Sequence, residues 1–480
     1  MSRPTLAIWS VLAMLATLVV GAQSAAAQTE AVGGAYPPTD PGLADGARSL
    51  HPFPDQLDCV EWPTDEWPTG ALPDGVRRSD LDQVAAQFRQ SSGRALVVVH
   101  GGRIVYEWYR DGITPDSINP SFSVSKSIAG TVAGTMVRDG TIADVEAPAP
   151  VPEWQGGGDP RAAITWHHLM NMRPGLEWNE NYSFGDPNND IILSIASGDA
   201  GGYVANKPLV ADPGTSYNYS TGTSNLLGRT MGQQLGLTGD DMDAEVRRRL
   251  FDPLGIGTVD MGFDQSGYWM GGFSTNMSTR DFARYGLLHL RDGQWDGRRL
   301  LPRNWSRRVG DDGYATQFWA GPQDRFRAVG LFGQSVSIAT DLDLVIAANS
   351  DAGGVASWRI EELFEQAAPP ACDGAVQFHR PLDDPTRRFR GGQQIMIRFS
   401  IHGDDGSGAG RSAAIVSRKV HCRTGVALKD DVAVRGRIAQ RANGWYRVRW
   451  QTRANWKGCR DLIITLPDDS VHSTVVKFAR

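Results

Sequence analysis

A serine and a lysine three residues apart are the side chains in this 480-residue sequence that could most directly do chemistry. Ser123 begins the run Ser-Val-Ser-Lys, which ends at Lys126. On a helix, residues at this spacing share one face with Cβ atoms about 5–6 Å apart, so the amine could take the serine proton or hold a partner that does. The positive potential of a helix N-terminus would favour the alkoxide. The spacing therefore predicts a nucleophilic serine for covalent catalysis.

The alternative is chance, because Ser-x-x-Lys is a loose pattern. Lysine is scarce in this chain, however: there are six lysines, and the other 42 of the 48 basic residues are arginines. Lys126 is the only lysine in the first 200 residues. A lone lysine three positions after a serine, at the expected start of a helix, favours a catalytic pair.

A second segment could supply a proton-transfer group. Residues 213–222 read Pro-Gly-Thr-Ser-Tyr-Asn-Tyr-Ser-Thr-Gly, and Asn-Leu-Leu-Gly follows at 225–228. A phenol normally has a pKa near 10, and a neighbouring ammonium would favour the phenolate, which could accept the serine proton. Tyr219 lies in this segment. The alternative is that Tyr219 is one of eleven tyrosines and only packs in the core.

These motifs make the chain resemble the class C β-lactamase and penicillin-binding serine hydrolase family, in particular its 6-aminohexanoate-dimer (nylon oligomer) hydrolase-like branch and related esterases. That branch carries Tyr-Ser-Asn or Tyr-Ser-Ser/Thr after Pro-Gly-Thr, and Tyr219-Ser220-Thr221 fits this element. Further stretches that match are residues 165–176, 200–208, 278–290, 292–299 and 333–334. The resemblance covers about residues 75 to 365. It implies that Ser123 is the nucleophile and that Tyr219, assisted by Lys126, is the general base.

The third element of the family, Lys-Thr-Gly or His-x-Gly, corresponds to Gly-Leu-Phe-Gly-Gln at residues 330–334. Leu331 replaces the basic residue, whereas Gly333 is retained and would let the strand approach the nucleophile closely. The resemblance implies an oxyanion hole formed by the backbone N–H groups of Ser123 and Gln334. Because Leu331 is apolar and Thr221 stands where an asparagine is usual, we expect poor β-lactamase activity.

The elements that must position these residues can be placed from hydrophobic periodicity and turn residues. Helices are predicted over 78–90, 123–139, 281–290 and 355–366, and strands over 95–100, 104–109, 329–338 and 342–349, with a turn at Thr340-Asp341. One strand pair lies near the start of the hydrolase region and the other near its end. We therefore predict one antiparallel sheet to which both ends of this region contribute strands. The fold class expected is α+β: a β-lactamase/transpeptidase-like domain, with an antiparallel sheet flanked by helices plus a helical region, followed by a C-terminal immunoglobulin-like β-sandwich.

The chain divides into four segments by composition. Residues 1–27 resemble a secretory signal peptide, with Arg3, an apolar run over 6–21 and a small-residue cleavage site at Ala25-Ala26-Ala27. Residues 28–75 form an irregular lead segment, and 76–367 the hydrolase domain. A Pro-Pro linker precedes the β-sandwich at 372–480, where short alternating runs are separated by turns. The mature protein is expected to be secreted, extracellular or periplasmic.

Four cysteines remain in the expected mature protein, and an even number in an exported chain favours disulfides. Cys422 with Cys459 would close a loop inside the C-terminal region. Cys59 with Cys372 would tie the lead segment to the domain boundary. Sequence alone leaves all three pairings open, and this one is preferred.

No other chemistry is indicated. The sequence has no Gly-x-Ser-x-Gly, His-Glu-x-x-His or Cys-x-x-Cys motif, so neither a metal nor a cofactor is expected. A net charge of −6 without a basic stretch argues against a nucleic-acid partner. The sequence after the expected signal peptide contains no second apolar run, so no membrane span is predicted there. We therefore expect a secreted serine hydrolase acting on a small amide or ester substrate, whose C-terminal domain could contact cell wall or another polymer.

Two alternatives remain open from the sequence. One is a DD-peptidase or a weak β-lactamase, which would use the same residues. The other is a catalytically weak surface protein that binds cell-wall or polymer ligands, an alternative that the apolar Leu331 keeps open.

Overall fold

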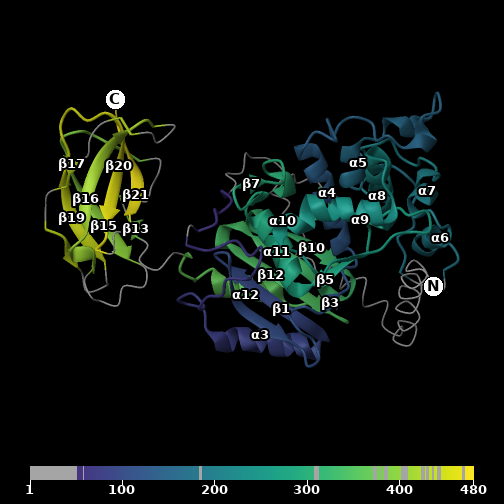
Figure 1. Ribbon diagram of the computed structural model, residues 1–480, viewed down its shortest axis with the longest axis horizontal. Helices are drawn as coiled ribbons and strands as arrows, with labels where there is room; N and C mark the ends of the chain where they lie inside the picture. The colour runs from purple at the N-terminus through teal and green to yellow at the C-terminus, as the bar shows by residue number, and fades with distance from the viewer. Residues whose placement is uncertain are drawn as a thin grey trace. The chain divides into compact units, whose positions relative to one another are not determined.

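The computed structural model describes residues 51–57, 59–182, 186–307, 313–370, 376–379, 381–382, 387–401, 409–422, 427–428, 432–434, 437–440, 445–467 and 471–479. The expected signal peptide and the first part of the lead segment lie outside these residues. The chain forms two compact units, one of Met1–Gln56 with Val60–Pro370 and one of Leu57–Cys59 with Ala371–Arg480 (Figure 1). Among the residues described, no helix has the length and apolar character needed to cross a membrane.

The larger unit is built on a seven-stranded antiparallel sheet in the order β2-β1-β12-β11-β10-β9-β8. Its strands are β1 (Gly93–His100), β2 (Arg103–Tyr109), β8 (Tyr314–Ala315), β9 (Phe318–Ala320), β10 (Phe326–Gly330), β11 (Gln334–Ala339) and β12 (Leu344–Ser350). β1 pairs with β12 over seven registered positions. This pairing brings the two ends of the unit together, as the sequence predicted.

Helices cover both faces of this sheet (Figure 1). α3 (Arg78–Gln90) and α12 (Ser357–Phe364) share one apolar core with one face of the sheet, and the inward residues of α3 are those at the predicted helical spacing. α4 (Val124–Arg138) and α11 (Thr279–Leu290) belong to the second, larger core on the other face. The helix α4, which follows Ser123, is therefore held against the sheet by apolar packing.

The prediction of one continuous strand over 329–338 is wrong. β10 ends at Gly330, a three-residue turn over Leu331–Gly333 follows, and β11 starts at Gln334, which pairs with Gly330. Phe332 and Gly333 have φ values of +61° and +88°, which strand residues do not adopt. A Cβ atom on Gly333 would lie 2.4 Å from the Cα of Gly354, so only glycine fits there. The predicted turn between β11 and β12 is confirmed, over Thr340–Leu342.

A helical region lies beside the sheet. It contains α5 (Trp166–Met170), α6 (Asp190–Ala196), α7 (Ala200–Ala205), α8 (Thr221–Leu235), α9 (Gly239–Val246), a π-helical turn (Arg247–Phe251) and α10 (Asp252–Leu254). Small sheets are formed by β3 (Ile118–Asn119), β4 (Asp260–Met261) and β5 (Thr275–Ser278), and by β6 (Gln294–Trp295) with β7 (Arg298–Arg299). Further 3-10 turns lie at Pro152–Trp154, Pro160–Ala163, Trp305–Arg307, Pro322–Asp324 and Ala409–Arg411.

The smaller unit contains two sheets around one apolar core. The first has the order β13-β15-β19-β18, with bounds Val376–His379, Gln394–Ile401, Tyr446–Gln451 and Ala439–Gln440. The second has the order β14-β21-β20-β16-β17, with bounds Arg388–Phe389, Val471–Phe478, Gly458–Thr465, Ala414–Val420 and Val432–Ala433.

The predicted disulfide between Cys422 and Cys459 is confirmed. Cys59 is also disulfide-bonded, and Cys372, its expected partner, lies outside the described residues.

Candidate active site

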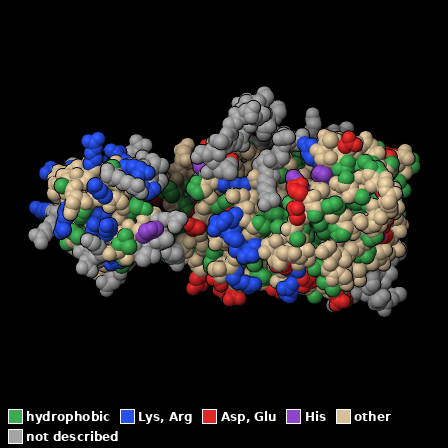
Figure 2. All heavy atoms as spheres, turned by 90° about the horizontal axis from the view of Figure 1, so that it is seen from above, with side chains coloured by type: hydrophobic (Ala, Val, Ile, Leu, Met, Phe, Trp, Pro, Cys, Tyr) green, Lys and Arg blue, Asp and Glu red, His purple; other side chains and the backbone are tan. Residues whose placement is uncertain are grey.

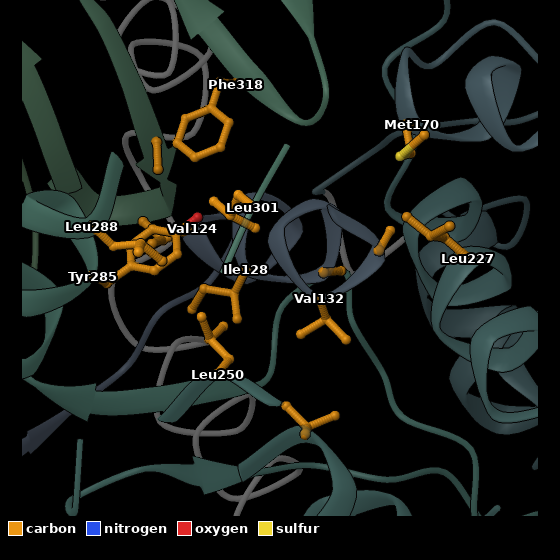
Figure 3. Packing of buried hydrophobic residues seen from close by; sticks show 14 of the residues in the cluster. Val124, Ile128, Val132, Met170, Leu227, Leu250, Tyr285, Leu288, Leu301 and Phe318 are labelled. Carbon is orange, nitrogen blue, oxygen red and sulfur yellow. The ribbon is translucent and has the colours of Figure 1, made fainter. Parts of the chain in front are cut away.

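Ser123 lies at the start of α4, in the position where a serine would normally cap the helix. Its side chain makes no capping hydrogen bond, so the hydroxyl is available for other partners. Behind it, Val124, Ile128 and Val132 lie along the core side of α4, among apolar side chains of the neighbouring elements (Figure 3). The apolar spacing of the helix therefore fixes where the serine stands.

Gln317 holds the nucleophile helix from the side. Its backbone oxygen accepts from Ser127 Oγ at 2.6 Å, and its Oε1 accepts from Ser224 Oγ of α8 at 2.8 Å. Its Nε2 donates to the backbone oxygens of Leu169 and Met170 at 3.1 and 2.9 Å. The backbone oxygen of Gln317 thus bonds to α4 and its side chain joins α8 to α5, a role that no sequence motif predicted.

Lys126 is 1% exposed, and its ammonium group has three acceptors. Nζ donates to Ser123 Oγ at 3.0 Å, to Thr221 Oγ1 at 3.0 Å and to the backbone oxygen of Gly272 at 2.8 Å. Burial lowers the pKa of Lys126 to about 8, and the Glu180 carboxylate opposes that fall. The lysine can therefore gain or lose a proton within one or two pH units of neutrality.

Asn225, from the Asn-Leu-Leu-Gly stretch, holds Gly272, whose backbone oxygen accepts from Lys126. Its Oδ1 accepts from the Gly272 N–H at 3.0 Å, and it is 1% exposed. A Cβ atom on Gly272 would lie 2.7 Å from the backbone oxygen of Thr221. A glycine at 272 leaves room for this close packing, and Asn225 holds its backbone, so the Gly272 carbonyl lies within reach of Lys126.

Tyr219 lies close to Lys126, and its pKa responds to the Ser123 side chain. The Lys126 Nζ atom lies 5.0 Å from the centre of its ring, and Trp319 stacks on the ring at 5.6 Å. Burial raises the pKa of Tyr219 above its usual value, and Glu180 and Tyr217 add to this rise, while the Ser123 side chain opposes it. The raised pKa opposes the phenolate that the sequence predicted for Tyr219, because desolvation favours the neutral phenol.

Glu180 is the functional candidate that the sequence did not reveal. Its Oε1 accepts from Thr221 Oγ1 at 2.6 Å, and its Oε2 accepts from the Thr221 N–H at 2.9 Å. The carboxylate also accepts from Trp178 Nε1 and from the Tyr182 hydroxyl. Thr221 is the first residue of α8, where the helix dipole favours a negative charge. No motif spacing identifies Glu180, because only the fold brings it to Thr221.

Thr221 therefore connects two opposite charges. Its Oγ1 accepts a hydrogen bond from Lys126 Nζ and donates one to Glu180 Oε1. A carboxylate only accepts and an ammonium only donates, so the direction of both bonds is set. The asparagine expected at this position by resemblance is replaced by a hydroxyl that links the lysine to a carboxylate.

The third element lies beside the nucleophile, but a different glycine makes the close approach. A Cβ atom on Gly330 would lie 3.2 Å from the Ser123 nitrogen and 2.4 Å from the Ser121 oxygen, whereas Gly333 packs on Gly354. Close approach by Gly333 is therefore a wrong prediction. Leu331 follows Gly330 in the turn and is partly buried.

Gln334, the expected oxyanion donor, is fully buried at the start of β11. Its side chain faces β12: Nε2 donates to the Ser350 oxygen at 2.6 Å, and Oε1 accepts from Asn349 Nδ2 at 2.9 Å. These bonds give the side chain a structural role at the base of the turn.

Two phenylalanine rings pack together beside Ser123. Phe122 precedes Ser123, and its ring meets the ring of Phe332 edge to face at 5.4 Å. Both have positive φ values, +43° and +61°, which bulky residues rarely adopt outside functional sites. The entrance to the nucleophile is therefore apolar on this side.

Metal ligands do not gather anywhere in the described part of the chain. His167 Nδ1 lies 2.7 Å from Glu146 Oε1, and His168 accepts from the Thr165 N–H in a helix cap. Both histidines have the packing and surface roles expected for neighbours on a helix.

The sequence profile of the beta-lactamase family matches residues 81–357, more than half of the chain. The chain belongs to the beta-lactamase family. The resemblance drawn from the motifs is thereby confirmed, and with it a β-lactamase/transpeptidase-like fold. Members of this family are serine hydrolases, and this beta-lactamase family member is a serine hydrolase of the Ser-x-x-Lys class that acts on amide or ester bonds.

Individual relatives of this beta-lactamase family chain are distant. It is 25% identical over 303 residues to the 6-aminohexanoate-dimer hydrolase of Paenarthrobacter ureafaciens, covering 56% of this chain and 75% of that protein. A provisionally assigned 6-aminohexanoate-dimer hydrolase from Bacillus anthracis superposes with a TM-score of 0.52 at 19% identity, over 65% of this chain and 87% of that one. A provisionally assigned beta-lactamase from Bacteroides dorei gives 0.51 at 17% identity, over 61% and 100%. These two structures share its fold.

Proposed function

We propose that this protein is an exported hydrolase that cleaves small amide or ester substrates through an acyl-enzyme on Ser123. The observation that carries the proposal is the placement of two proton-transfer groups on one hydroxyl. Lys126 Nζ lies 3.0 Å from Ser123 Oγ and 5.0 Å from the centre of the Tyr219 ring, so both groups stand beside the same hydroxyl. A buried lysine with a pKa near 8, beside a serine that does not cap its helix, is suited to nucleophile activation.

The pKa directions assign the proton steps. Neutral Lys126 takes the Ser123 proton as Oγ bonds to the substrate carbonyl carbon, and Nζ becomes an ammonium. Tyr219, a neutral phenol, then gives its proton to the leaving nitrogen or oxygen and receives one from Lys126 as the scissile bond breaks. Water attacks the acyl group by the same proton route in reverse, which frees Ser123 for another cycle.

The oxyanion hole is assigned to the Ser123 N–H and to the turn after β10. Gly330 and Gln334 are register partners across the hairpin, and Leu331 follows Gly330 in the turn. The close approach of Gly330 to the Ser123 nitrogen favours the N–H of the next residue, Leu331, over the Gln334 N–H as second donor.

Glu180 is assigned a positioning role. Through the Thr221 hydroxyl it stabilises the ammonium form of Lys126, which is the form produced when Ser123 attacks. It also holds Thr221 in place by two hydrogen bonds. Removing the carboxylate should therefore change the pKa of Lys126 as well as the local geometry.

The surroundings of Ser123 favour uncharged acyl groups. Phe122, Leu331 and Phe332 bring no cation to the place where the family often has one, so a substrate carboxylate gains no partner there. The relative from Paenarthrobacter ureafaciens is named for an amide substrate, 6-aminohexanoate dimer, which supports amide cleavage as well as ester cleavage. Penicillins, which carry a carboxylate, are expected to be poor substrates.

The smaller unit is proposed to be an immunoglobulin-like β-sandwich that attaches the enzyme to cell wall or another polymer. Two sheets on one apolar core and the Cys422–Cys459 disulfide support the sandwich. The disulfides and the N-terminal sequence pattern support export by a signal peptide over residues 1–27.

Kinetics with a short-chain ester and a matched amide test the proposed roles. Lys126→Ala and Tyr219→Phe should each lower kcat about 10²–10⁴-fold, as expected for proton-transfer groups. Ser417→Ala, at a buried serine bonded to Arg460 in the smaller unit, is the matched control and should keep near-native rates. Near-native rates in both Lys126→Ala and Tyr219→Phe would contradict the proposal.

A further inference from the structure

Figure 2 shows charged side chains of both signs on the visible face of the larger unit, where water solvates them. Inside this unit lies a row of polar side chains, the polar row, which must satisfy its hydrogen bonds without bulk water. Its members come from five elements: Arg94 of β1, Asn119 of β3, Thr279 of α11, Asn349 of β12 and Gln334 of β11. All of them except Arg94 are at most 1% exposed. Polar groups buried this deeply specify structure when each of them is satisfied.

The inner end of the polar row is the Gln334 side chain. Its Oε1 accepts from the Ser350 N–H at 3.2 Å, and its Nε2 donates to the Ser350 oxygen at 2.6 Å. Because a backbone N–H only donates and a carbonyl only accepts, these two bonds fix which way round the amide lies. Nε2 also donates to the Leu331 oxygen at 3.2 Å. The polar row therefore ends on the backbone of the turn that follows β10.

Each bond outward from Gln334 has the same direction. Gln334 Oε1 also accepts from Asn349 Nδ2 at 2.9 Å, and Asn349 Oδ1 accepts from Thr279 Oγ1 at 2.8 Å. Thr279 Oγ1 in turn accepts from Asn119 Nδ2 at 3.2 Å, and Asn119 Oδ1 accepts from Arg94 Nε at 2.8 Å. Every donated hydrogen points inward, from the Arg94 cation toward the turn. Hydrogen bonds aligned in this way polarise one another, which strengthens the bond at the inner end.

The outer end of the polar row is set by a bulge in β1. The register of β1 on β12 shifts between Gly93 and Ala95, so Arg94 is the extra residue of the bulge. A bulge re-aims the side chain that it carries, and bulges are frequent next to active sites. The Arg94 guanidinium meets Asn119 through Nε and pairs with Asp351 through Nη1 at 3.0 Å. The sheet itself therefore holds the positive end of the row.

One glutamine holds the turn on both sides of the Leu331 N–H. The backbone of Gln334 pairs with Gly330, and its side chain holds the Leu331 oxygen. Phe332, the next residue, has a φ of +61°, which an aromatic residue keeps only where its surroundings over-determine it. The polar row therefore supports the peptide groups on either side of Leu331, at the place where Gly330 approaches the Ser123 nitrogen.

We propose that the polar row positions the Leu331 N–H as an oxyanion donor, so that Gln334 and Asn349 are positioning residues for acyl transfer. This rests on the proposed function, in which Ser123 attacks and the Leu331 N–H is the second donor. Negative charge develops on the substrate oxygen only as the bond to Ser123 forms, so a displaced donor costs transition-state stabilisation more than substrate binding. Disruption of the polar row should therefore lower kcat and leave KM nearly unchanged.

Thr279 allows the row to be broken without a change in the turn itself. Thr279→Val keeps the shape but removes the hydroxyl that joins Asn119 to Asn349. For a short-chain neutral ester, kcat should fall about 10-fold, less than when an oxyanion donor is removed outright, with KM within about 2-fold. Thr279→Ser restores the hydroxyl and should restore kcat. Thr230→Val is the matched control, because it removes an equally buried hydroxyl, which donates to the Leu226 oxygen in α8, and its kcat should stay near native.

The outer end provides a second pair of variants, which remains usable if Thr279→Val does not fold, because Arg94 is partly exposed. Arg94→Met removes the cation that begins the row, and kcat should fall about 3-fold. Arg110→Met is its control, because Arg110 pairs with the same Asp351 but is outside the row. An alkyl trifluoromethyl ketone, whose adduct with Ser123 places an oxyanion in the hole, should bind more weakly to Thr279→Val and Arg94→Met in proportion to the fall in kcat. Circular dichroism and Tm show whether each variant is folded.

Several results would overturn the inference. Equal falls in kcat for Thr279→Val and Thr230→Val would mean that general loosening of the core lowers activity. A rise in KM at native kcat would mean that the row shapes substrate binding instead. Native kcat in folded Thr279→Val and Arg94→Met would separate the row from the oxyanion hole, while hydrolysis that depends on Ser123 would leave the proposed function standing. A native enzyme without Ser123-dependent hydrolysis would refute the proposed function itself, and this inference with it.

Discussion

Replacing Glu180 by glutamine should move the pH dependence of catalysis toward lower pH. In the proposed mechanism hydrolysis requires neutral Lys126, so activity should rise with pH through the pKa of this lysine, which is about 8. The Glu180 carboxylate favours the charged ammonium and raises that pKa. Removing the negative charge therefore lowers the pKa, and the neutral amine becomes available at lower pH.

The size of the effect follows from the geometry. Hydrogen bonds of 3.0 and 2.6 Å join the two charges through Thr221, so Lys126 Nζ and the nearer Glu180 oxygen are at most about 5.6 Å apart. At an effective dielectric constant of about 20, two unit charges at this distance interact by about 3 kcal/mol, or about 2 in pKa. Because Glu180 is partly exposed, water screens part of this, and we expect a fall of about 1 to 2.

The assay is kcat/KM for a neutral ester between pH 5 and 10, with each variant compared with its own plateau. The acid limb should move from a midpoint near 8 in the native enzyme to about 6–7 in Glu180→Gln. Thr221→Val, which keeps the shape but removes the connecting hydroxyl, should move it in the same direction, and Thr221→Ser should restore the native midpoint. The plateau itself should fall in Glu180→Gln, because the ammonium formed during attack is less stabilised.

Asp190 provides the matched control for this experiment. It is a buried carboxylate in the same segment, where it accepts from the Asn179 N–H at 2.8 Å and pairs with Lys207. Asp190→Asn should lower the Tm without moving the acid limb. An unchanged midpoint in a folded Glu180→Gln enzyme would refute the electrostatic link between Glu180 and Lys126.

Three other results are expected. Leu331→His, assayed near pH 6 where histidine is largely protonated, should raise kcat/KM for carboxylate-bearing substrates relative to neutral esters by about 10-fold, and no change in this ratio would contradict the apolar-entrance argument. A chain truncated after Ala367, with Cys59→Ser, should retain ester hydrolysis; loss of activity in a folded truncated enzyme would mean that the tail completes the site. Cys422→Ser should destabilise the smaller unit by up to about 4 kcal/mol in denaturant melts, because its partner Cys459 is 37 residues away; an unchanged melt would exclude that contribution.

Local periodicity predicted much of the fold. The apolar spacing in 78–90 correctly placed α3, with Leu81, Val84, Ala85 and Phe88 inward, because a helix against a sheet must bury one stripe. The strand predicted over 329–338 was wrong, because its β-forming residues flank a turn. Phe332 adopts a left-handed conformation that its type does not favour, so only the tertiary contacts of the turn explain it.

The candidate site was predictable where sequence neighbours supply the chemistry. Ser123 and Lys126 are joined by helical spacing, and the structure brings Tyr219 to them. Glu180 and Gln317 could not be identified, because they reach the site from distant segments without a motif. The pKa of Tyr219 could not be predicted either, since it depends on burial between Trp319 and Tyr314, which the sequence does not show.

The central claim is that Ser123 is the nucleophile, and intact-protein mass after incubation with a fluorophosphonate tests it most directly. The native protein should gain the mass of one phosphonyl group and lose esterase activity in proportion. The Ser123→Ala protein should gain no mass and show no hydrolysis above background, while Lys126→Ala should be labelled much more slowly. Stoichiometric labelling of Ser123→Ala, or full ester hydrolysis by that variant, would contradict the account.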